Sequence, residues 1–151
     1  MKIADIRKWD PCLESQQLIN DHADDELKPI EILKTPLLAG RDDWRLWVVL
    51  REELIDKRTL RLFACDCAER ALRKTQVKDK RCWQAIKIAR KYAEGKATGA
   101  ELNAARDAAR DAAWNAARDA ARDAEGKWQV KHLTTLLANE DVATNHEKKK
   151  C

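Results

Sequence analysis

The sequence predicts an all-α protein: a compact bundle of about six helices with a long alanine-rich helix at its centre. The 151 residues include only four Gly and three Pro, and charged residues make up 37% of the chain. Such a composition favours helices over sheets, because turn formers are few and strong helix formers are many. Apolar side chains also recur at helical spacing in several segments, and alanine-rich tetrads follow one another in the C-terminal half.

The length fits a single domain, which we expect to span residues 1–139, with a less regular part at 1–40. Residues 140–151 are expected to form a disordered basic tail, because they hold little apolar surface to bury. No stretch is apolar enough to span a membrane, and the first residues lack the apolar core of a signal peptide. Five scattered cysteines fit reduced thiols, so a cytoplasmic location is expected.

The first forty residues hold two segments that are bounded or interrupted by Pro. Asp10 and Pro11 are typical of a helix start, because Asp caps and Pro is tolerated at the first helical position. Pro29 and Pro36 interrupt residues 30–38, which we interpret as a short helix or an irregular segment.

Two amphipathic helices are expected next. Residues 43–55, capped by Asp42 and Asp43, carry an apolar stripe at i, i+3, i+4 and i+7. Thr59 is expected to cap the helix at 60–73, whose apolar side chains fill an arc of roughly 200°. That breadth predicts a helix packed on two sides, near the middle of the core.

Three further helices complete the bundle. Asp79 is expected to begin one that runs to about residue 94 and stops at Gly95. Thr98 and Glu101 have the spacing of a capping box, which predicts a helix over 99–125 that Gly126 closes. A last helix is expected at 127–139.

Residues 104–123 are the tetrads AARD, AARD, AAWN, AARD and AARD. Four residues turn about 400°, so the alanine pair advances by about 40° per tetrad and the small-residue stripe winds around the helix. The stripe suits a central strut that neighbouring helices approach closely, and it equally suits a self-association surface. We favour the strut.

The central tetrad is irregular, because Trp and Asn replace Arg and Asp. Trp is enriched at binding hot spots, and an Arg lies one turn away on either side, within stacking reach. A partner-binding surface is therefore a hypothesis for Arg110, Asp111, Trp114, Asn115, Arg118 and Asp119, although Trp at helical spacing more often belongs to a core.

Charge is unevenly distributed along the chain. Residues 1–56 carry 8 basic and 13 acidic side chains, residues 57–96 carry 13 and 4, and residues 97–151 carry 9 and 9. This asymmetry has two interpretations: it attracts a partner, or the acidic residues 1–56 dock onto the basic residues 57–96. Both interpretations stay open. The candidate acidic patch is Asp21, Asp24, Asp25 and Glu26, and the candidate nucleic-acid patch is Lys80, Lys87, Arg90 and Lys91.

The sequence predicts no catalytic residues, no metal site and no cofactor. The three histidines lie in unrelated segments, Cys65 and Cys67 point about 200° apart on one helix, and no Gly-rich phosphate loop or nucleophile turn occurs. We therefore expect a protein that is not an enzyme.

Three blocks carry a family resemblance: WRLWVVLREEL at 44–54, LRLFACDCAERAL at 60–72, and ARKYAEGKAT at 89–98 leading into the AARD repeats. Over about residues 36–139 the chain resembles the alanine-rich putative immunity protein family of bacteria and phages, which is associated with polymorphic toxins. The resemblance implies a cytoplasmic protein that binds and neutralises a partner. It carries over no catalytic residues and no named partner.

Three functions are weighed on these grounds. The leading hypothesis is a non-catalytic, immunity-like inhibitor that neutralises a toxin or defence protein by direct binding, as a monomer or homodimer without membrane association. The alternatives are a nucleic-acid-binding module that uses the Lys/Arg stripe and a self-associating structural protein.

Overall fold

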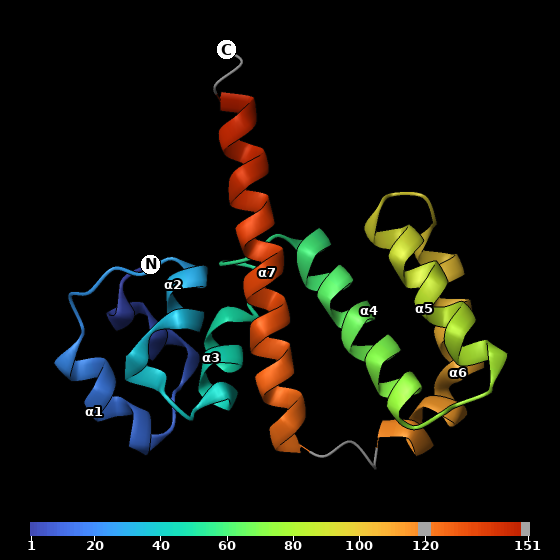
Figure 1. The fold of residues 1–151 in the computed structure, drawn as a ribbon, viewed down its shortest axis with the longest axis horizontal. Helices are drawn as coiled ribbons and strands as arrows, with labels where there is room; N and C mark the ends of the chain where they lie inside the picture. Colours follow the sequence, from blue (N-terminus) through green and yellow to red (C-terminus); the bar gives the residue numbers. More distant parts are fainter. Residues whose placement is uncertain (118–121, 149–151) are drawn as a thin grey trace.

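The computed structural model describes the backbone of residues 1–117 and 122–148, and the side chains of residues 1–109 and 126–139. This part of the chain contains seven α-helices, two 3₁₀ helices and no β-strand, so the predicted all-α class is confirmed (Figure 1). In chain order the elements are η1 (Ile3–Trp9), α1 (Leu13–Asp21), α2 (Pro29–Lys34), η2 (Pro36–Leu38), α3 (Asp42–Val49), α4 (Lys57–Lys74), α5 (Lys80–Ala93), α6 (Gly99–Ala117) and α7 (Arg122–Lys148).

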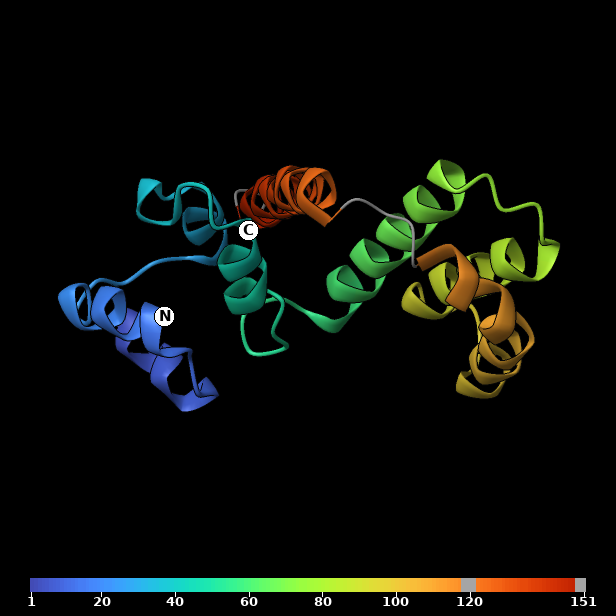
Figure 2. The same cartoon turned by 90° about the horizontal axis from the view of Figure 1, so that it is seen from below.

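The first five elements form a group of short helices that packs against α7 (Figures 1 and 2). Their buried side chains join those of α7 in one apolar cluster, which includes Ile19, Leu33 and Val49 from the short helices and Leu133 and Leu137 from α7. The region predicted to be less regular is thus built from short helices. Cys12, and not Asp10, is the residue before α1, because Asp10 adopts a left-handed backbone conformation that ends η1.

Helix α4 is packed on two sides, as its broad apolar arc predicts. Phe63 belongs to the cluster shared with α7, whereas Leu72 packs with Cys82 of α5 and Ala109 of α6 in a second cluster. The predicted cap is wrong: Asp56 accepts hydrogen bonds from the backbone of Arg58 and Thr59, so α4 begins at Lys57. An Asp carboxylate accepts two backbone donors at once, whereas the side chain of Thr59 is buried.

The boundaries predicted for α5 and for the start of α6 are confirmed. Asp79 accepts a hydrogen bond from the backbone of Arg81, and Gly95 follows α5 with a positive φ of 73°. Thr98 and Glu101 cap α6 reciprocally, with 2.7 Å from Thr98 N to Glu101 Oε2 and 3.3 Å from Glu101 N to Thr98 Oγ1.

The C-terminal helices differ from the prediction. Gly126 does not close the alanine-rich helix, because α6 is described to Ala117 and a separate helix, α7, begins at Arg122 and runs through Gly126. A Gly inside a helix is unfavourable by only about 1 kcal/mol relative to Ala, which the packing of α7 offsets. The backbone of α7 also continues to Lys148, beyond the end that the sequence predicts at residue 139.

The alanine-rich helix is not the central strut. Helix α6 packs against α5 and α4 at one end of the molecule, whereas α7 lies between the N-terminal group and α4 (Figures 1 and 2). The physical reason is side-chain size. Val130, Leu133 and Leu137 of α7 bury far more apolar surface than alanines do, and apolar burial determines which helix occupies the middle.

Candidate protein-binding cleft

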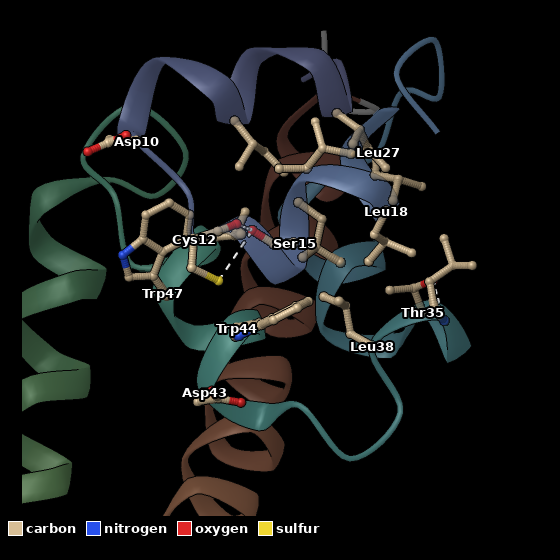
Figure 3. A pocket seen from close by; sticks show the side chains of 16 residues that line it. Asp10, Cys12, Ser15, Leu18, Leu27, Thr35, Leu38, Asp43, Trp44 and Trp47 are labelled. Carbon is tan, nitrogen blue, oxygen red and sulfur yellow. Dashed lines mark hydrogen bonds between the residues drawn. The ribbon is translucent and has the colours of Figure 1, made fainter. Parts of the chain in front are cut away.

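An apolar cleft of about 440 Å³ opens in the N-terminal group (Figure 3). Eleven of its sixteen lining residues are apolar, and they come from η1, α1, α2, η2 and α3 and from the turn before α2. Leu18 and Leu27 stand on one side, and Leu38 and Trp44 on the other. A cleft of this size and lining falls within the range of protein sites that take apolar ligands or side chains. We call it the tryptophan cleft.

Local sequence explains the wall formed by η2 and α3. Pro36 begins η2, and the Thr35 hydroxyl caps it by accepting a hydrogen bond of 3.3 Å from the backbone of Leu37. Arg45 of α3 donates to the Thr35 carbonyl at 2.7 Å, which ties the two elements together. The spacing of Trp44, Trp47 and Val48 then directs all three side chains of α3 to the cleft.

The rim of the tryptophan cleft exposes large apolar side chains. Trp47 is 39% exposed and Leu37 is 40% exposed, although both line the cleft. Trp47 meets Trp9 edge to face at 6.3 Å, and the Arg51 guanidinium lies 4.7 Å from the centroid of each ring. Exposed apolar groups with neighbouring Trp and Arg are typical of interaction surfaces, because these residues dominate binding energy at interfaces.

The polar groups at the mouth are engaged with their own chain. The Ser15 hydroxyl donates to the Cys12 carbonyl at 2.7 Å, and Cys12 Sγ lies 3.5 Å from Ser15 Oγ (Figure 3). This side-chain hydrogen bond lowers the pKa of the exposed Cys12 thiol. The mouth therefore holds a thiol of raised thiolate content beside a Ser15 hydroxyl that already donates within the chain.

The charged residues that line the cleft, Asp10 and Asp43, are both acidic. Hydrogen bonds from Arg41 lower the pKa of Asp43, so Asp43 stays ionised at neutral pH, and Arg41 also pairs with Glu14 at 3.5 Å. Asp10 is exposed and forms no ion pair with any described residue. The two carboxylates that line the cleft are thus accompanied by Glu14 and Arg41, while Arg51 and Lys8 lie over the Trp9 ring at the rim.

The predicted acidic patch is close in sequence to residues that line the cleft. It occupies the end of α1 and the turn that leads to Leu27, which lines the cleft. All four carboxylates are exposed. Asp21 accepts from Gln17, and Asp25 lies 2.9 Å from His22 Nδ1. Helix α7 stands between the N-terminal group, which holds this patch, and the basic helix α5 (Figure 1).

The other two predicted surfaces lie on the alanine-rich helix and on α5. The side chains of Arg110, Asp111, Trp114 and Asn115 lie outside the described residues, as do Arg118 and Asp119 entirely. The predicted basic stripe is wrong in one member, because Arg90 turns inward. Its guanidinium pairs with Asp66 at 2.6 Å and with Glu69 at 2.7 Å, both on α4. Lys80, Lys87 and Lys91 remain exposed on α5.

A polar junction joins α4, α5 and α7. Asp66 accepts from Arg90 and lies 2.5 Å from His132 Nε2, and the His132 ring stacks on Trp128 at 4.8 Å and on Phe63 at 6.1 Å. Asp66 is thus shared by Arg90 of α5 and His132 of α7, so the junction links the three helices through one carboxylate. Among the described residues, no three His, Cys, Asp or Glu side chains gather to hold a metal ion.

Sequence reasoning missed the tryptophan cleft. Its one visible signal in the sequence is the pair Trp44 and Trp47, which belongs to the apolar stripe predicted for residues 43–55. No family model, curated protein or solved structure matches the chain. No described helix has both the length and the apolar character needed to cross a membrane.

Proposed function

We propose that this chain is a non-catalytic, cytoplasmic binding protein that neutralises a toxin or defence protein by direct contact, as its resemblance to immunity proteins implies. The contact surface is the tryptophan cleft and its rim. The single observation that carries the proposal is that Trp47 and Leu37 remain exposed at the edge of an apolar cleft. Exposed apolar surface around a cavity is unfavourable in water unless a partner covers it.

Charge determines the kind of partner. Residues 1–56 carry a net charge of −5, from 8 basic and 13 acidic residues, and the lining charges of the cleft are acidic. A partner surface that is apolar at its centre and basic at its edge is complementary to this face. Complementary charge accelerates association and selects the orientation of the two proteins.

The test places a photo-reactive amino acid at Leu37 or, as a control, at Gln84 on the exposed face of α5. We expect irradiation of producing cells to cross-link one protein from position 37 and not from position 84. The same protein, once purified, should bind with one-to-one stoichiometry and lose its activity in the complex. Trp47→Ala should weaken that binding by roughly 30-fold, the effect of a hot spot of about 2 kcal/mol.

The proposal fails if position 37 yields no adduct, or if the purified adduct partner binds Trp47→Ala as tightly as the parent chain. It also fails if the complex retains the partner's full activity, because inhibition is part of the claim.

A second candidate function keeps one observation in its favour. Lys80, Lys87 and Lys91 are exposed along α5, and phosphate contacts by such side chains drive non-specific nucleic-acid binding. The inward pairing of Arg90 weakens this candidate, since one of its four cations is neutralised within the protein. Replacing the three lysines with Gln should abolish any gel shift at about 50 mM salt, and no shift by the parent chain there would remove the candidate.

A further inference from the structure

Apart from the carboxylates of Asp10 and Asp43, the walls of the tryptophan cleft offer an occupant few hydrogen-bonding groups. Among its polar lining residues, the Ser15 hydroxyl donates to the Cys12 carbonyl and the Thr35 hydroxyl accepts from Leu37. The one β-bridge among the described residues, Lys2 to Glu26, is internal to the chain, so the cleft presents no sheet edge to which a strand could add.

An extended segment would therefore bring unpaired backbone N–H and C=O groups against apolar walls. Leaving such groups without partners is unfavourable by about 1–3 kcal/mol each. A helix avoids this, because its backbone groups bond within the segment. It also presents apolar side chains at i, i+3, i+4 and i+7 on one face, which suits a cleft whose two sides are themselves helices.

The charges of the mouth add a second requirement. Asp10 is exposed without an ion pair to any described residue, and Asp43 shares Arg41 with Glu14. A segment with carboxylates beside its apolar face would meet like charge, whereas one with Lys or Arg would meet opposite charge. The two carboxylates that line the cleft thus favour an occupant with a cationic flank.

We infer that the tryptophan cleft receives an amphipathic helix with bulky apolar side chains on one face and Lys or Arg beside them. This inference rests on the proposed function and deepens it, since it states which part of a partner protein enters the cleft. The apolar face fills the space between Leu18 and Trp44, and the cationic flank reaches Asp10.

The probes are three Trp-free, stapled helical peptides of about 15 residues, since shorter unstapled helices are marginal in water. One has Leu on its apolar face and Lys elsewhere, the second replaces Lys with Glu, and the third replaces Leu with Ala and keeps Lys. In calorimetric titrations of the full chain we expect the Leu–Lys peptide to bind roughly tenfold tighter than the Leu–Glu peptide. The Ala–Lys peptide should not bind, because it lacks apolar side chains.

Two variants and one chemical readout locate the binding. Asp10→Asn should weaken the binding of the Leu–Lys peptide roughly threefold and should not weaken the binding of the Leu–Glu peptide. Asn tolerates the left-handed backbone conformation of position 10. Glu94→Gln, whose carboxylate pairs with Lys96 at the end of α5, is the matched control and should change neither. A bromoacetyl group on the peptide should alkylate the exposed Cys12, whose thiolate displaces bromide to form a thioether, ahead of Cys65, Cys67 and Cys82.

The outcomes separate the two claims. Equal binding of the Leu–Lys and Leu–Glu peptides would overturn the cationic flank and leave the proposed function standing. Equal binding of the Leu–Lys and Ala–Lys peptides would overturn the apolar anchor, and binding by none of the three would overturn the helical occupant. The proposed function itself is tested separately, by the cross-link from position 37, by the binding of Trp47→Ala and by the activity of the partner in the complex.

Discussion

Leu133→Ala tests whether α7, and not the alanine-rich helix, holds the molecule together. Leu133 is 0% exposed and belongs to the cluster that joins α7 to the N-terminal group and to α4. The substitution removes roughly three methylene equivalents, each worth about 0.8 kcal/mol when buried, or about 2.4 kcal/mol in all. A cavity term raises the expected loss to about 3–5 kcal/mol, a large share of the 5–15 kcal/mol by which domains are stable.

The assay is urea unfolding followed by far-ultraviolet circular dichroism. With a slope of about 1–3 kcal/mol per molar urea, a loss of 3 kcal/mol lowers the midpoint by about 1–3 M. The matched control is Leu13→Ala, because Leu13 is 82% exposed and its truncation should change the free energy of unfolding by no more than about 0.5 kcal/mol. If Leu133→Ala were as mild as Leu13→Ala, the placement of α7 in the core would be refuted.

The remaining predictions concern a cap, a carboxylate and the cleft rim. Asp56→Ala should lower the free energy of unfolding by about 0.5–2 kcal/mol in urea titrations, because two backbone donors of α4 lose their acceptor. Hydrogen bonds from Arg73, and next from Arg90, lower the pKa of Glu69. The ionised carboxylate therefore stabilises the folded chain at pH values above its unfolded pKa of about 4.5, and this stabilisation is lost as the pH falls through the lower folded pKa. The stability difference between the parent chain and Glu69→Gln should therefore shrink between about pH 6 and pH 3. Trp47→Ala should destabilise the isolated chain by only about 1–2 kcal/mol, since its ring is partly exposed and its main described partners are one aromatic edge contact and one cation.

Each of these has a result that would contradict it. Unchanged stability of Asp56→Ala would mean that α4 begins elsewhere. If the difference in the free energy of unfolding between the parent chain and Glu69→Gln stays constant with pH, the two arginines do not stabilise the ionised carboxylate of Glu69. Complete unfolding of Trp47→Ala would make Trp47 a core residue and remove the cleft rim as a binding surface.

Local patterns predicted the parts of the fold that local chemistry determines. Asp79 and Gly95 bound α5, and Thr98 with Glu101 begins α6, because each signal acts on backbone groups within a few residues of it. The broad apolar arc of α4 also correctly indicated packing on two sides. The stop predicted at Gly126 is wrong, because a glycine is a weak helix stop when the residues that follow it, such as Val130 and Leu133, are packed.

The candidate site was out of reach for a different reason. The tryptophan cleft is assembled from separate short segments between Ile3 and Val48, and no local spacing relates Leu18 to Trp44 or Asp10 to Asp43. The stripe of α3 identified the right face, but periodicity alone does not tell whether a face is covered by the protein or left for a partner. The inward pairing of Arg90 was hidden likewise, since its acids lie on another helix.

The claim that a partner helix enters the tryptophan cleft is tested most directly by nuclear magnetic resonance of the tryptophan indole N–H groups during titration with the Leu–Lys peptide. Trp44 and Trp47 line the cleft, whereas the indole of Trp83 donates to the Val77 carbonyl at 2.9 Å in the second apolar cluster. We predict saturable shifts of the Trp44 and Trp47 indole signals at one peptide per chain, with the Trp83 signal unmoved. Shifts confined to Trp83, or no shift at saturating peptide, would contradict the claim.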